Sequence, residues 1–366
     1  MTNKLRVGVL FGGQSGEHEV SIVSARAVMN GLDREKYDVL PIGITKDGRW
    51  IAGDHAPALI ESLADPALLP GGSQHTTEQQ DTELPVHATS ADAQLAGSST
   101  SVLSSLDVAF PVLHGPRGED GTVQGLFELA EVPYVGCGVM ASAVGMDKAM
   151  MKAAFAAAGL AQVPWAFVRR IDFTSEPEAV VERLEKKLRY PMFVKPANMG
   201  SSVGISKATN HDELAAGLHL AASYDRRIVV EQGLNVREIE VAVLGNDEPE
   251  ASVAGEIVPS KEWYDYEAKY GGAESKILIP APITAAQMDE VRTLAIQAFK
   301  AIDGSGLARV DFLMDKDSGA LYINEVNTMP GFTSVSMYGK MWQASGLSYG
   351  ALLDKLIELA VQRHAK

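Results

Sequence analysis

Leu-Ala-Arg-Val-Asp-Phe-Leu-Met at residues 307–314 and Ala-Leu-Tyr-Ile-Asn-Glu-Val at residues 320–326 are the two most informative segments of the sequence. In part of each segment apolar residues alternate with polar ones, which is typical of a strand. The polar loop between them ends at Gly319, so the two segments predict a β-hairpin.

Four polar side chains of this hairpin point to its chemistry. Because side chains alternate across a strand, Arg309 and Asp311 share one face, and Glu325 and Asn327 share another. If the two faces coincide, two carboxylates, a carboxamide and a guanidinium meet beside the free backbone amide of Gly331. Hard oxygen ligands of this kind suit magnesium, which completes its shell with nucleotide phosphates. The alternative is that the acids only cover a solvated strand face.

Whole-chain composition narrows the class of protein. A length of 366 residues predicts two or three domains, and the net charge of −15 argues against a nucleic-acid or anionic-membrane partner. The single cysteine excludes an internal disulfide and fits a reducing compartment. The chain has no signal-peptide pattern and no run of about 18 apolar residues, so we expect a cytoplasmic protein with no membrane partner.

The first part of the chain alternates strands and helices. We expect buried strands at residues 6–11, 39–44 and 107–113, a helix starting near Glu19, and a second helix at residues 122–130. This order predicts a doubly wound parallel sheet with its functional loops at the carboxyl ends of the strands. The apolar face of the first helix is expected at Val20, Val23, Ala27 and Val28.

The remaining segments predict further units. Residues 71–105 are rich in small polar residues and predict a surface insertion with no chemistry assigned. An Ala/Met-rich helix is expected at residues 148–160, followed by strands that end at Pro196 and at Glu231. A third unit begins with residues 238–244 and closes with an amphipathic helix, whose apolar residues are Leu352, Leu353, Leu356, Ile357 and Leu359.

Gly-Gly-Gln-Ser-Gly-Glu-His-Glu at residues 12–19 is a glycine-rich turn from strand to helix. It is neither a dinucleotide-binding fingerprint nor a Walker A motif, but it places backbone amides beside Glu17. An acid at this position repels phosphate and attracts an ammonium group, so we interpret Glu17 as an anchor for a ligand amine. An acid that merely complements the helix dipole is an equally open alternative.

His-Gly-Pro-Arg-Gly-Glu-Asp-Gly at residues 114–121 follows the third expected strand. A loop with three glycines and several polar groups lowers stability unless it serves a function. We expect His114 to position or neutralise a substrate carboxylate, and a purely structural histidine is the alternative.

A nucleotide site is expected around Lys195 and the Gly/Ser-rich hairpin that runs to Gly204. Such a hairpin covers phosphates with backbone amides and hydroxyls while the lysine supplies charge. Lys148 is a candidate second phosphate lysine or a solvated one. Between Glu231 and Glu238, backbone groups could meet an adenine edge, with Glu238 reaching a ribose hydroxyl.

Residues 263–272 form an aromatic, charged loop that ends in two glycines. We interpret this loop as a lid that closes over the nucleotide and excludes water. An ordinary packed surface loop is the alternative.

With these motifs in this order, the sequence resembles the D-alanine–D-alanine ligase family of the ATP-grasp superfamily. His-Gly-x-x-Gly-Glu-Asp-Gly-Thr-Val-Gln-Gly at residues 114–125 matches one family signature. Arg-x-Asp followed by Glu-x-Asn-Thr-x-Pro-Gly, within residues 309–331, matches the other. Further matching segments are residues 12–21, 195–204 and 264–270.

The resemblance implies an α/β fold with an N-terminal doubly wound (pre-ATP-grasp) parallel-sheet domain at residues 1–146. A two-part ATP-grasp α+β module follows, with a small central subdomain at residues 147–232 and a C-terminal catalytic subdomain at residues 233–366. Residues of about 52–105 lie outside the likeness and form a variable insertion.

The resemblance also implies the reaction and its residues. ATP phosphorylates the carboxylate of one D-alanine, and the amine of a second attacks this acylphosphate to give D-alanyl-D-alanine for peptidoglycan precursors, with ADP and phosphate released. Catalytic roles fall to Glu17, Ser201, Tyr270, Arg309 and Gly331. Substrate-binding roles fall to His114, Tyr264, Ser336 and Met337. ATP-binding roles fall to Lys148, Lys195, Glu231, Leu234, Glu238 and Lys269. Two magnesium (or manganese) ions would be held by Asp311, Glu325 and Asn327.

Three alternatives bear on this hypothesis. Retention of Tyr270 in the lid motif favours an amine over a hydroxy-acid nucleophile, while D-serine stays open as second substrate. Another ATP-grasp ligase would share the metal strands but is not expected to carry the His114 loop beside the Glu17 segment. A regulator with a dead site would lack a metal ligand or Arg309, and neither is missing. The family resemblance further implies a homodimer.

Overall fold

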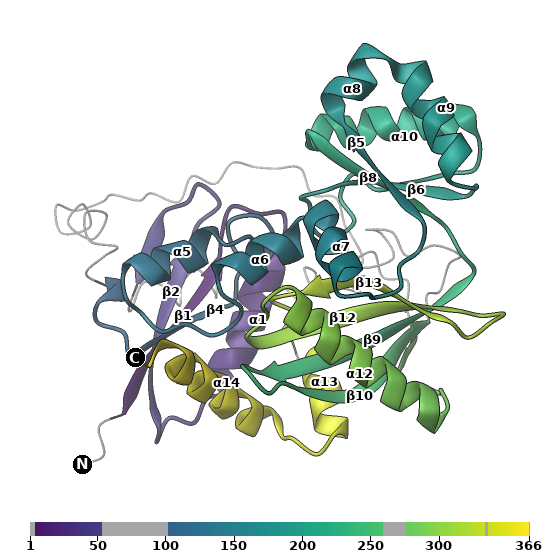
Figure 1. The fold of residues 1–366 in the computed structure, drawn as a ribbon. Helices are drawn as coiled ribbons and strands as arrows, with labels where there is room; N and C mark the ends of the chain where they lie inside the picture. Colours follow the sequence, from purple (N-terminus) through teal and green to yellow (C-terminus); the bar gives the residue numbers. More distant parts are fainter. Residues whose placement is uncertain (1–3, 53–101, 259–275, 334–335, 366) are drawn as a thin grey trace, which may run out of the picture.

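The structure, a computed structural model, describes residues 4–52, 102–258, 276–333 and 336–365. Within these ranges the strands form three sheets, one for each part of the expected fold (Figure 1). None of the helices in the same ranges has the length and apolarity that crossing a membrane requires.

The N-terminal sheet has the strand order β3-β2-β1-β4. Its strands are β1 (Leu5–Gly12), β2 (Tyr37–Ile44), β3 (Trp50–Ala52) and β4 (Val108–Pro111). The pairs β1–β2 and β1–β4 are parallel, while β3 joins β2 antiparallel at the edge. Helices of this part are α1 (His18–Gly31), α5 (Thr122–Leu129) and α6 (Val139–Met146). The predicted parallel sheet is confirmed, and the loops after β1 and β4 lie side by side at its carboxyl edge.

The buried face of α1 differs from the predicted one. Val28 is buried as expected, but Val20, Val23 and Ala27 are only half-buried, and the apolar stripe runs through Ile22, Ala25 and Met29. The reason is that the same side of the helix also buries three polar residues, which hold neighbouring loops: His18, Ser21 and Ser24. A pattern of apolar residues alone therefore misjudges the rotation of this helix.

The central sheet has the order β5-β8-β6-β7 and is antiparallel. Its strands are β5 (Trp165–Arg169), β6 (Met192–Pro196), β7 (Ser206–Ala208) and β8 (Arg227–Gln232). Its helices are α8 (Arg170–Ser175), α9 (Pro177–Lys187) and α10 (His211–Tyr224). Val168, Val194 and Val230 face these helices and form one separate core, so the opposite face is free to carry Lys195 and Glu231.

The C-terminal sheet is antiparallel, with the order β11-β10-β9-β12-β13. Its strands are β9 (Val236–Gly245), β10 (Glu250–Val258), β11 (Lys276–Leu278), β12 (Gly306–Asp315) and β13 (Leu321–Asn327). One face packs against α12 (Ala285–Ala301) and α7 (Lys148–Ala157) through residues such as Val310 and Phe312. The other face carries the polar residues of the hairpin.

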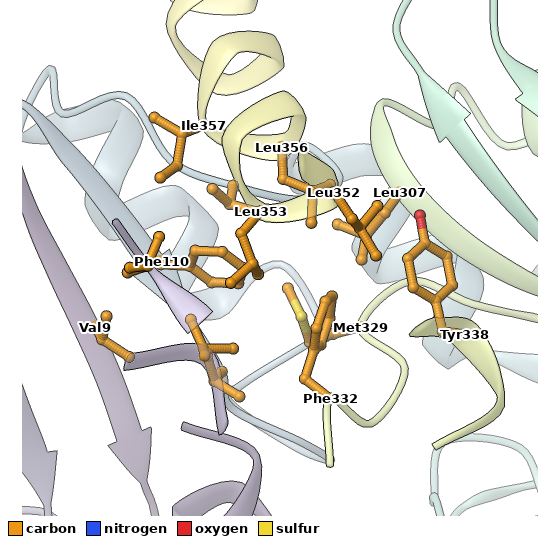
Figure 2. Close-up of a cluster of buried hydrophobic side chains, with 14 of the residues drawn as sticks. Val9, Phe110, Leu307, Met329, Phe332, Tyr338, Leu352, Leu353, Leu356 and Ile357 are labelled. Atoms are coloured by element: carbon orange, nitrogen blue, oxygen red, sulfur yellow. The ribbon is translucent and has the colours of Figure 1, made fainter. Parts of the chain in front are cut away.

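A single apolar cluster joins the two ends of the chain (Figure 2). It unites Val9 and Phe110 of the N-terminal sheet with Leu307 of β12. Apolar residues of α13 (Met337–Ala344) and α14 (Tyr349–His364) complete it, and those of α14 are the five predicted from the sequence together with Ala360. Figure 1 shows α14 lying beneath both sheets.

Packing crosses two of the proposed domain boundaries. Helix α7 begins the expected central subdomain, yet its Met151 and Phe155 belong to the core of the C-terminal sheet. Helix α14 belongs to the C-terminal subdomain in sequence and packs on the N-terminal sheet. We keep 1–146, 147–232 and 233–366 as proposed boundaries along the chain, with these two helices as the connections between units.

Candidate active site

The register of β12 and β13 brings the four hairpin side chains together. Asp311 lies directly opposite Glu325, and Arg309 lies opposite Asn327, so all four share one face of the sheet. The register shifts by one residue immediately after Asp311, which marks a β-bulge at the site. The prediction that the two polar faces coincide is therefore confirmed.

Arg309 is the cationic centre of this face. Its guanidinium donates two hydrogen bonds to Asp311, with Nε–Oδ1 at 2.7 Å and Nη2–Oδ2 at 2.6 Å. It also lies 3.3 Å from Oε2 of Glu240 on β9, a residue that the sequence analysis did not single out. Burial opposes the charged form, but Asp311 and Glu240 outweigh it and raise the pKa of Arg309 well above its usual range. The guanidinium is therefore fully charged and held in one orientation.

The donor chemistry of the hairpin fits a magnesium-nucleotide complex. Asp311, Glu325 and Asn327 offer hard oxygens, and two of them are carboxylates set opposite each other. Together with Glu240 they place three acids around the single guanidinium of Arg309, so a further cation would be favoured on this face. Among the described residues, no group of three or more His, Cys, Asp or Glu side chains is arranged to hold a metal ion by itself. Phosphate oxygens would have to complete the coordination, which is how magnesium is usually bound to nucleotides.

The loop after β13 is held in place because two of its residues are anchored in the core. Met329 and Phe332 are buried in the cluster of Figure 2. The backbone N–H of Met329 donates to Oδ1 of Asn327 at 3.2 Å, and the N–H of Phe332 donates to Oγ of Ser24 at 3.3 Å. The amide of Gly331 is thus carried by a loop that is fixed on both sides.

His114 ties the N-terminal unit to this loop. Its Nδ1 donates to the carbonyl of Met329 at 3.0 Å, and its Nε2 lies 3.5 Å from Oγ of Ser24. Burial lowers the pKa of His114, against the opposing effects of Glu17 and the Met329 carbonyl, so the ring is neutral at pH 7. In this structure the side chain holds two loops together, and any interaction with a substrate carboxylate would be a hydrogen bond from a neutral ring.

Ser336 and Met337 begin α13 beside Gly331. A Cβ placed on Gly331 would lie 3.0 Å from Oγ of Ser336, so the two residues are neighbours. The Ser336 hydroxyl accepts a hydrogen bond from the N–H of Thr333 at 3.0 Å. The Met337 side chain is buried in the core, and a Cβ on Gly255 would meet its Cε at 2.4 Å. Met337 can therefore act on a ligand only through its backbone amide at the helix N-terminus.

Glu17 meets the Gly/Ser-rich hairpin of the central unit. Oγ of Ser201 donates a hydrogen bond to Oε1 of Glu17. A Cβ on Gly200 would lie 3.2 Å from the other carboxylate oxygen, and one on Gly115 would lie 3.1 Å from it. Three segments that are far apart in sequence thus converge on the Glu17 carboxylate.

The backbone at these contacts is unusual. Ser201 has φ 48° and Ser202 has φ 60°, in the left-handed region that disfavours residues with a Cβ. Gly12 has φ 89°, and a Cβ there would meet the carbonyl oxygen of Ile44 at 2.2 Å. Gly12 adopts this conformation without strain, whereas the strain at Ser201 and Ser202 persists because the surrounding structure imposes it, which is common at functional sites.

Glu119 is a site residue that the sequence analysis did not single out. Its Oε1 accepts a hydrogen bond from the N–H of Gly115 at 2.8 Å. Burial and the nearby carboxylate of Glu17 raise the pKa of Glu119 to about 8. The group is therefore mostly a neutral acid at pH 7, which avoids a second negative charge beside Glu17.

The expected nucleotide lysines lie as follows. Nζ of Lys195 is 2.6 Å from Oε2 of Glu231, and Nζ of Lys148 donates to the carbonyl of Met199 at 2.7 Å. Burial would lower the pKa of Lys195, but Glu231 outweighs it and raises that pKa. Glu325 and Glu238 of the C-terminal sheet make smaller contributions to the raised pKa of Lys195. Lys195, on the central sheet, therefore interacts electrostatically with acids of the C-terminal sheet.

Other predicted residues differ in what the structure describes. Glu238 lies on β9, on the face it shares with Glu240, and Leu234 is half-buried in the connection from β8 to β9. The predicted lid residues lie outside the described residues: Tyr264, Lys269 and Tyr270.

The residues missed by sequence reasoning share a property. Glu119, Lys152 and Glu240 become notable only through partners that lie on other elements. Glu240 follows Glu238 at strand spacing, which was the one signal available for it. Lys152 follows Lys148 by four residues, so the two share one face of the expected helix, and this spacing was the sequence signal for Lys152.

Comparison with protein-family models gives two matches that together cover most of the chain. The model described as the D-ala D-ala ligase N-terminus matches residues 6–137. The model described as the D-ala D-ala ligase C-terminus matches residues 154–358.

Curated proteins and solved structures agree with these matches. The chain is 54% identical to a D-alanine–D-alanine ligase of Heliobacterium modesticaldum, over 99% of this chain and 96% of that protein. It is 51% identical to one of Geobacillus thermodenitrificans, again over 99% and 96%. The D-alanine-D-alanine ligase structure from Coxiella burnetii superposes with a TM-score of 0.79 at 36% identity, covering 99% of this chain and 95% of that one. The VanG D-Ala:D-Ser ligase from Enterococcus faecalis gives a TM-score of 0.79 at 35% identity, covering 98% and 100%.

Proposed function

Because this chain belongs to the D-alanine–D-alanine ligase family, we propose that the site described above divides the ligation among three groups of residues. The enzyme is an ATP-dependent ligase that joins two D-alanines into D-alanyl-D-alanine for peptidoglycan synthesis and releases ADP and phosphate. The groups bind the first D-alanine, the triphosphate and the second D-alanine.

The first group holds the D-alanine that becomes phosphorylated. Glu17 attracts its ammonium group, and the hydrogen bond from Ser201 keeps the carboxylate of Glu17 in place. The neutral state of Glu119 leaves Glu17 as the negative charge nearest the amine. This arrangement directs the substrate carboxylate away from Glu17 and towards Arg309.

The second group neutralises charge during phosphoryl transfer. Lys148 and Lys195 bind the phosphates, with Lys269 of the expected lid. Glu231, Leu234 and Glu238 bind the adenine and ribose. Asp311, Glu325 and Asn327 would hold two magnesium or manganese ions, which supply positive charge to the phosphates when bound. Arg309 adds a fixed cation on the same face.

The third group serves the attack of the second D-alanine. The carboxylate of this substrate lies against Ser336 and the first backbone amides of α13, where the helix dipole favours an anion. His114 and Tyr264 complete the pocket for the substrates. Arg309 and the amide of Gly331 stabilise the oxyanion that forms when the amine attacks the acylphosphate. Tyr270 would join Ser201 and Glu17 to close the lid.

The observation that carries this assignment is the hairpin register, which sets Arg309, Asp311, Glu325 and Asn327 on one face. The face lies at the amino-acid site because the loop after β13 is bonded to His114 and Ser24. A contribution of Glu325 to the raised pKa of Lys195 supports placing the same face beside the proposed nucleotide site.

The test is magnesium-dependent phosphate release from ATP, with products identified by mass. D-alanine, L-alanine, and D-alanine with D-lactate or D-serine are compared. We expect release matched by D-alanyl-D-alanine, with no turnover of L-alanine. Well-folded protein that shows no D-alanine-dependent release would contradict the assignment.

Second-substrate choice, location and assembly are further parts of the proposal. D-serine stays open at the second site, since a D-Ala:D-Ser ligase is among the similar structures. We place the enzyme in the cytoplasm as a homodimer, as the family resemblance implies. Light scattering on purified protein measures the assembly. A monomer at the concentration used in the activity assays would contradict the homodimer and leave the proposed reaction unaffected.

A further inference from the structure

Lys152 is a buried cation that the roles above do not use. It lies on α7, one turn after Lys148, and its side chain is 1% exposed. Its Nζ lies 2.9 Å from Oε1 of Glu231 and 6.0 Å from the centre of the Trp165 ring. The second oxygen of Glu231 is taken by Lys195 at 2.6 Å.

One carboxylate therefore faces two ammonium groups. Burial opposes ionisation of Glu231, but Lys152 and Lys195 outweigh it and lower the pKa of Glu231 to about 2. An ordinary buried ion pair needs only one lysine, and a second cation in a dry site is costly unless an anion balances it. The pair of lysines is thus suited to a site that receives a negatively charged ligand.

The two lysines differ in position. Lys195 is 15% exposed and lies on β6, which leads into the Gly/Ser-rich hairpin. Lys152 is almost fully enclosed and comes from α7, whose Met151 and Phe155 are anchored in the C-terminal core. Lys195 is therefore the one able to turn towards a ligand, while Lys152 stays against Glu231.

We propose that Lys152 is a positioning residue for the nucleotide: it holds Glu231 so that Lys195 is free to bind phosphate. In the free enzyme both lysines share the carboxylate. When a triphosphate arrives, Lys195 turns to its oxygens and Lys152 alone keeps Glu231 paired and in place. This inference rests on the proposed role of Lys195 in ATP binding.

The test compares binding of Mg-ATP with binding of adenosine, which has no phosphates, by calorimetry. In Lys152→Met, Lys195 becomes the one lysine left on Glu231 within the described part of the chain, and it is held back from phosphate. We expect the Kd of Mg-ATP to rise by about tenfold or more and that of adenosine to change by less than about threefold. In turnover assays the KM for ATP should rise, while the KM for D-alanine changes by less than about twofold.

A double variant isolates the route through Glu231. In Glu231→Gln no carboxylate charge holds back Lys195, so Lys152 has nothing left to act through. Adding Lys152→Met to Glu231→Gln should therefore lower ATP affinity by less than about twofold relative to Glu231→Gln alone. Lys186→Met on α9, where the side chain is 77% exposed, is the control and should leave both ligands unchanged. If Lys152→Met does not fold, Lys152→Gln takes its place.

Two outcomes overturn the inference. If Lys152→Met weakens the binding of ATP and of adenosine equally, Lys152 only supports the fold. If ATP binding by Lys152→Met is unchanged, Lys152 has no role in positioning the nucleotide. These binding ratios do not depend on D-alanine. Absence of D-alanine turnover in the wild type would contradict the proposed ligase reaction and leave the ATP comparison intact.

Discussion

At the scale of single residues, the site depends on carboxylates whose charge is set by their neighbours. Glu231 is kept ionised by two lysines, whereas Glu119 is kept mostly neutral by burial and by Glu17. Asp311 is bound on both oxygens by Arg309. The same type of side chain thus serves as an anion, a neutral acid and an orienting partner, according to its surroundings.

Arg309→Met should damage turnover more than nucleotide binding. The change removes the fixed cation from the face that carries Asp311 and Glu240, so we expect kcat to fall by about a thousandfold while Mg-ATP binding changes by less than about tenfold. Rapid-quench kinetics and calorimetry measure the two quantities.

Arg292→Met is the matched control for that experiment. Arg292 lies on α12, on the opposite face of the same sheet, and donates to the carbonyl of Ala251 at 2.9 Å. This variant should keep kcat within about threefold of wild type. Equal losses of ATP binding and kcat in Arg309→Met would make Arg309 a nucleotide clamp.

Glu325→Gln tests the proposed metal position. The change removes a carboxylate charge next to Asp311 and keeps the size of the side chain. We expect turnover to fall by about a hundredfold or more and the magnesium concentration for half-maximal rate to rise. A magnesium titration of the rate measures both, and activity within about tenfold of wild type would remove Glu325 from the metal site.

Glu119→Gln should change how stability depends on pH. Between its ordinary value of 4.5 and its raised pKa of about 8, folded Glu119 holds a proton that the unfolded chain has released. The wild type therefore loses stability as pH rises through this window, and a glutamine, which is always neutral, does not. The difference in Tm, variant minus wild type, should be more positive near pH 8.5 than near pH 5, by about 3 °C or more.

Calorimetric scans of the protein without nucleotide or metal measure this difference. Glu35→Gln, at an exposed position between α1 and β2, is the control and should show no such trend. A difference in Tm that is the same at both pH values would show that Glu119 is ionised in the folded protein.

At the scale of elements, α7 carries Lys148 and Lys152, the first a proposed phosphate ligand and the second the proposed positioning residue. Its N-cap residue, Asp147, accepts hydrogen bonds from the N–H groups of Ala149 and Met150, both at 3.0 Å, and is ion-paired with Arg227 on β8. Four residues further along β8, Glu231 meets Lys152 of the same helix. Helix α7 is thus held to the central sheet at two points.

Asp147→Ala should destabilise the protein and weaken ATP binding together. Loss of an N-cap costs about 1 kcal/mol, and loss of the Arg227 pair adds to it. Asp147→Ser retains a cap without the charge, so its loss of unfolding free energy in urea should be smaller.

Thr284→Ala removes the cap of α12 and serves as the comparison. It should lower stability by a similar amount, about 1 kcal/mol, and leave ATP affinity unchanged because none of the residues proposed to bind nucleotide lies on α12. If Asp147→Ala also left ATP affinity unchanged, α7 would not position the lysines.

At the scale of the whole molecule, the described residues form separate cores that need not unfold together. The cluster in Figure 2 joins the N-terminal sheet, β12 and the last two helices. The core of the central sheet, by contrast, consists of residues of that unit alone. The two ends of the chain should therefore unfold cooperatively, and the central unit can unfold independently.

Leu356→Ala and Leu184→Ala compare these two cores. Each removes a fully buried side chain and should cost about 2–5 kcal/mol. In hydrogen exchange, Leu356→Ala should weaken protection in both β1 and β12, whereas Leu184→Ala should weaken it only between β5 and β8. Loss of protection spread evenly over all three sheets in both variants would show a single cooperative unit.

Sequence patterns alone were enough to predict the parallel N-terminal sheet, the polar hairpin and five of the six buried apolar residues of α14. These follow from local periodicity and turn residues, which depend on neighbours a few positions away. The tertiary structure decided the rotation of α1, the shared core, and the partners of Glu119, Lys152 and Glu240. Burial and electrostatic interactions depend on which surfaces meet in space, and local sequence patterns do not specify those contacts.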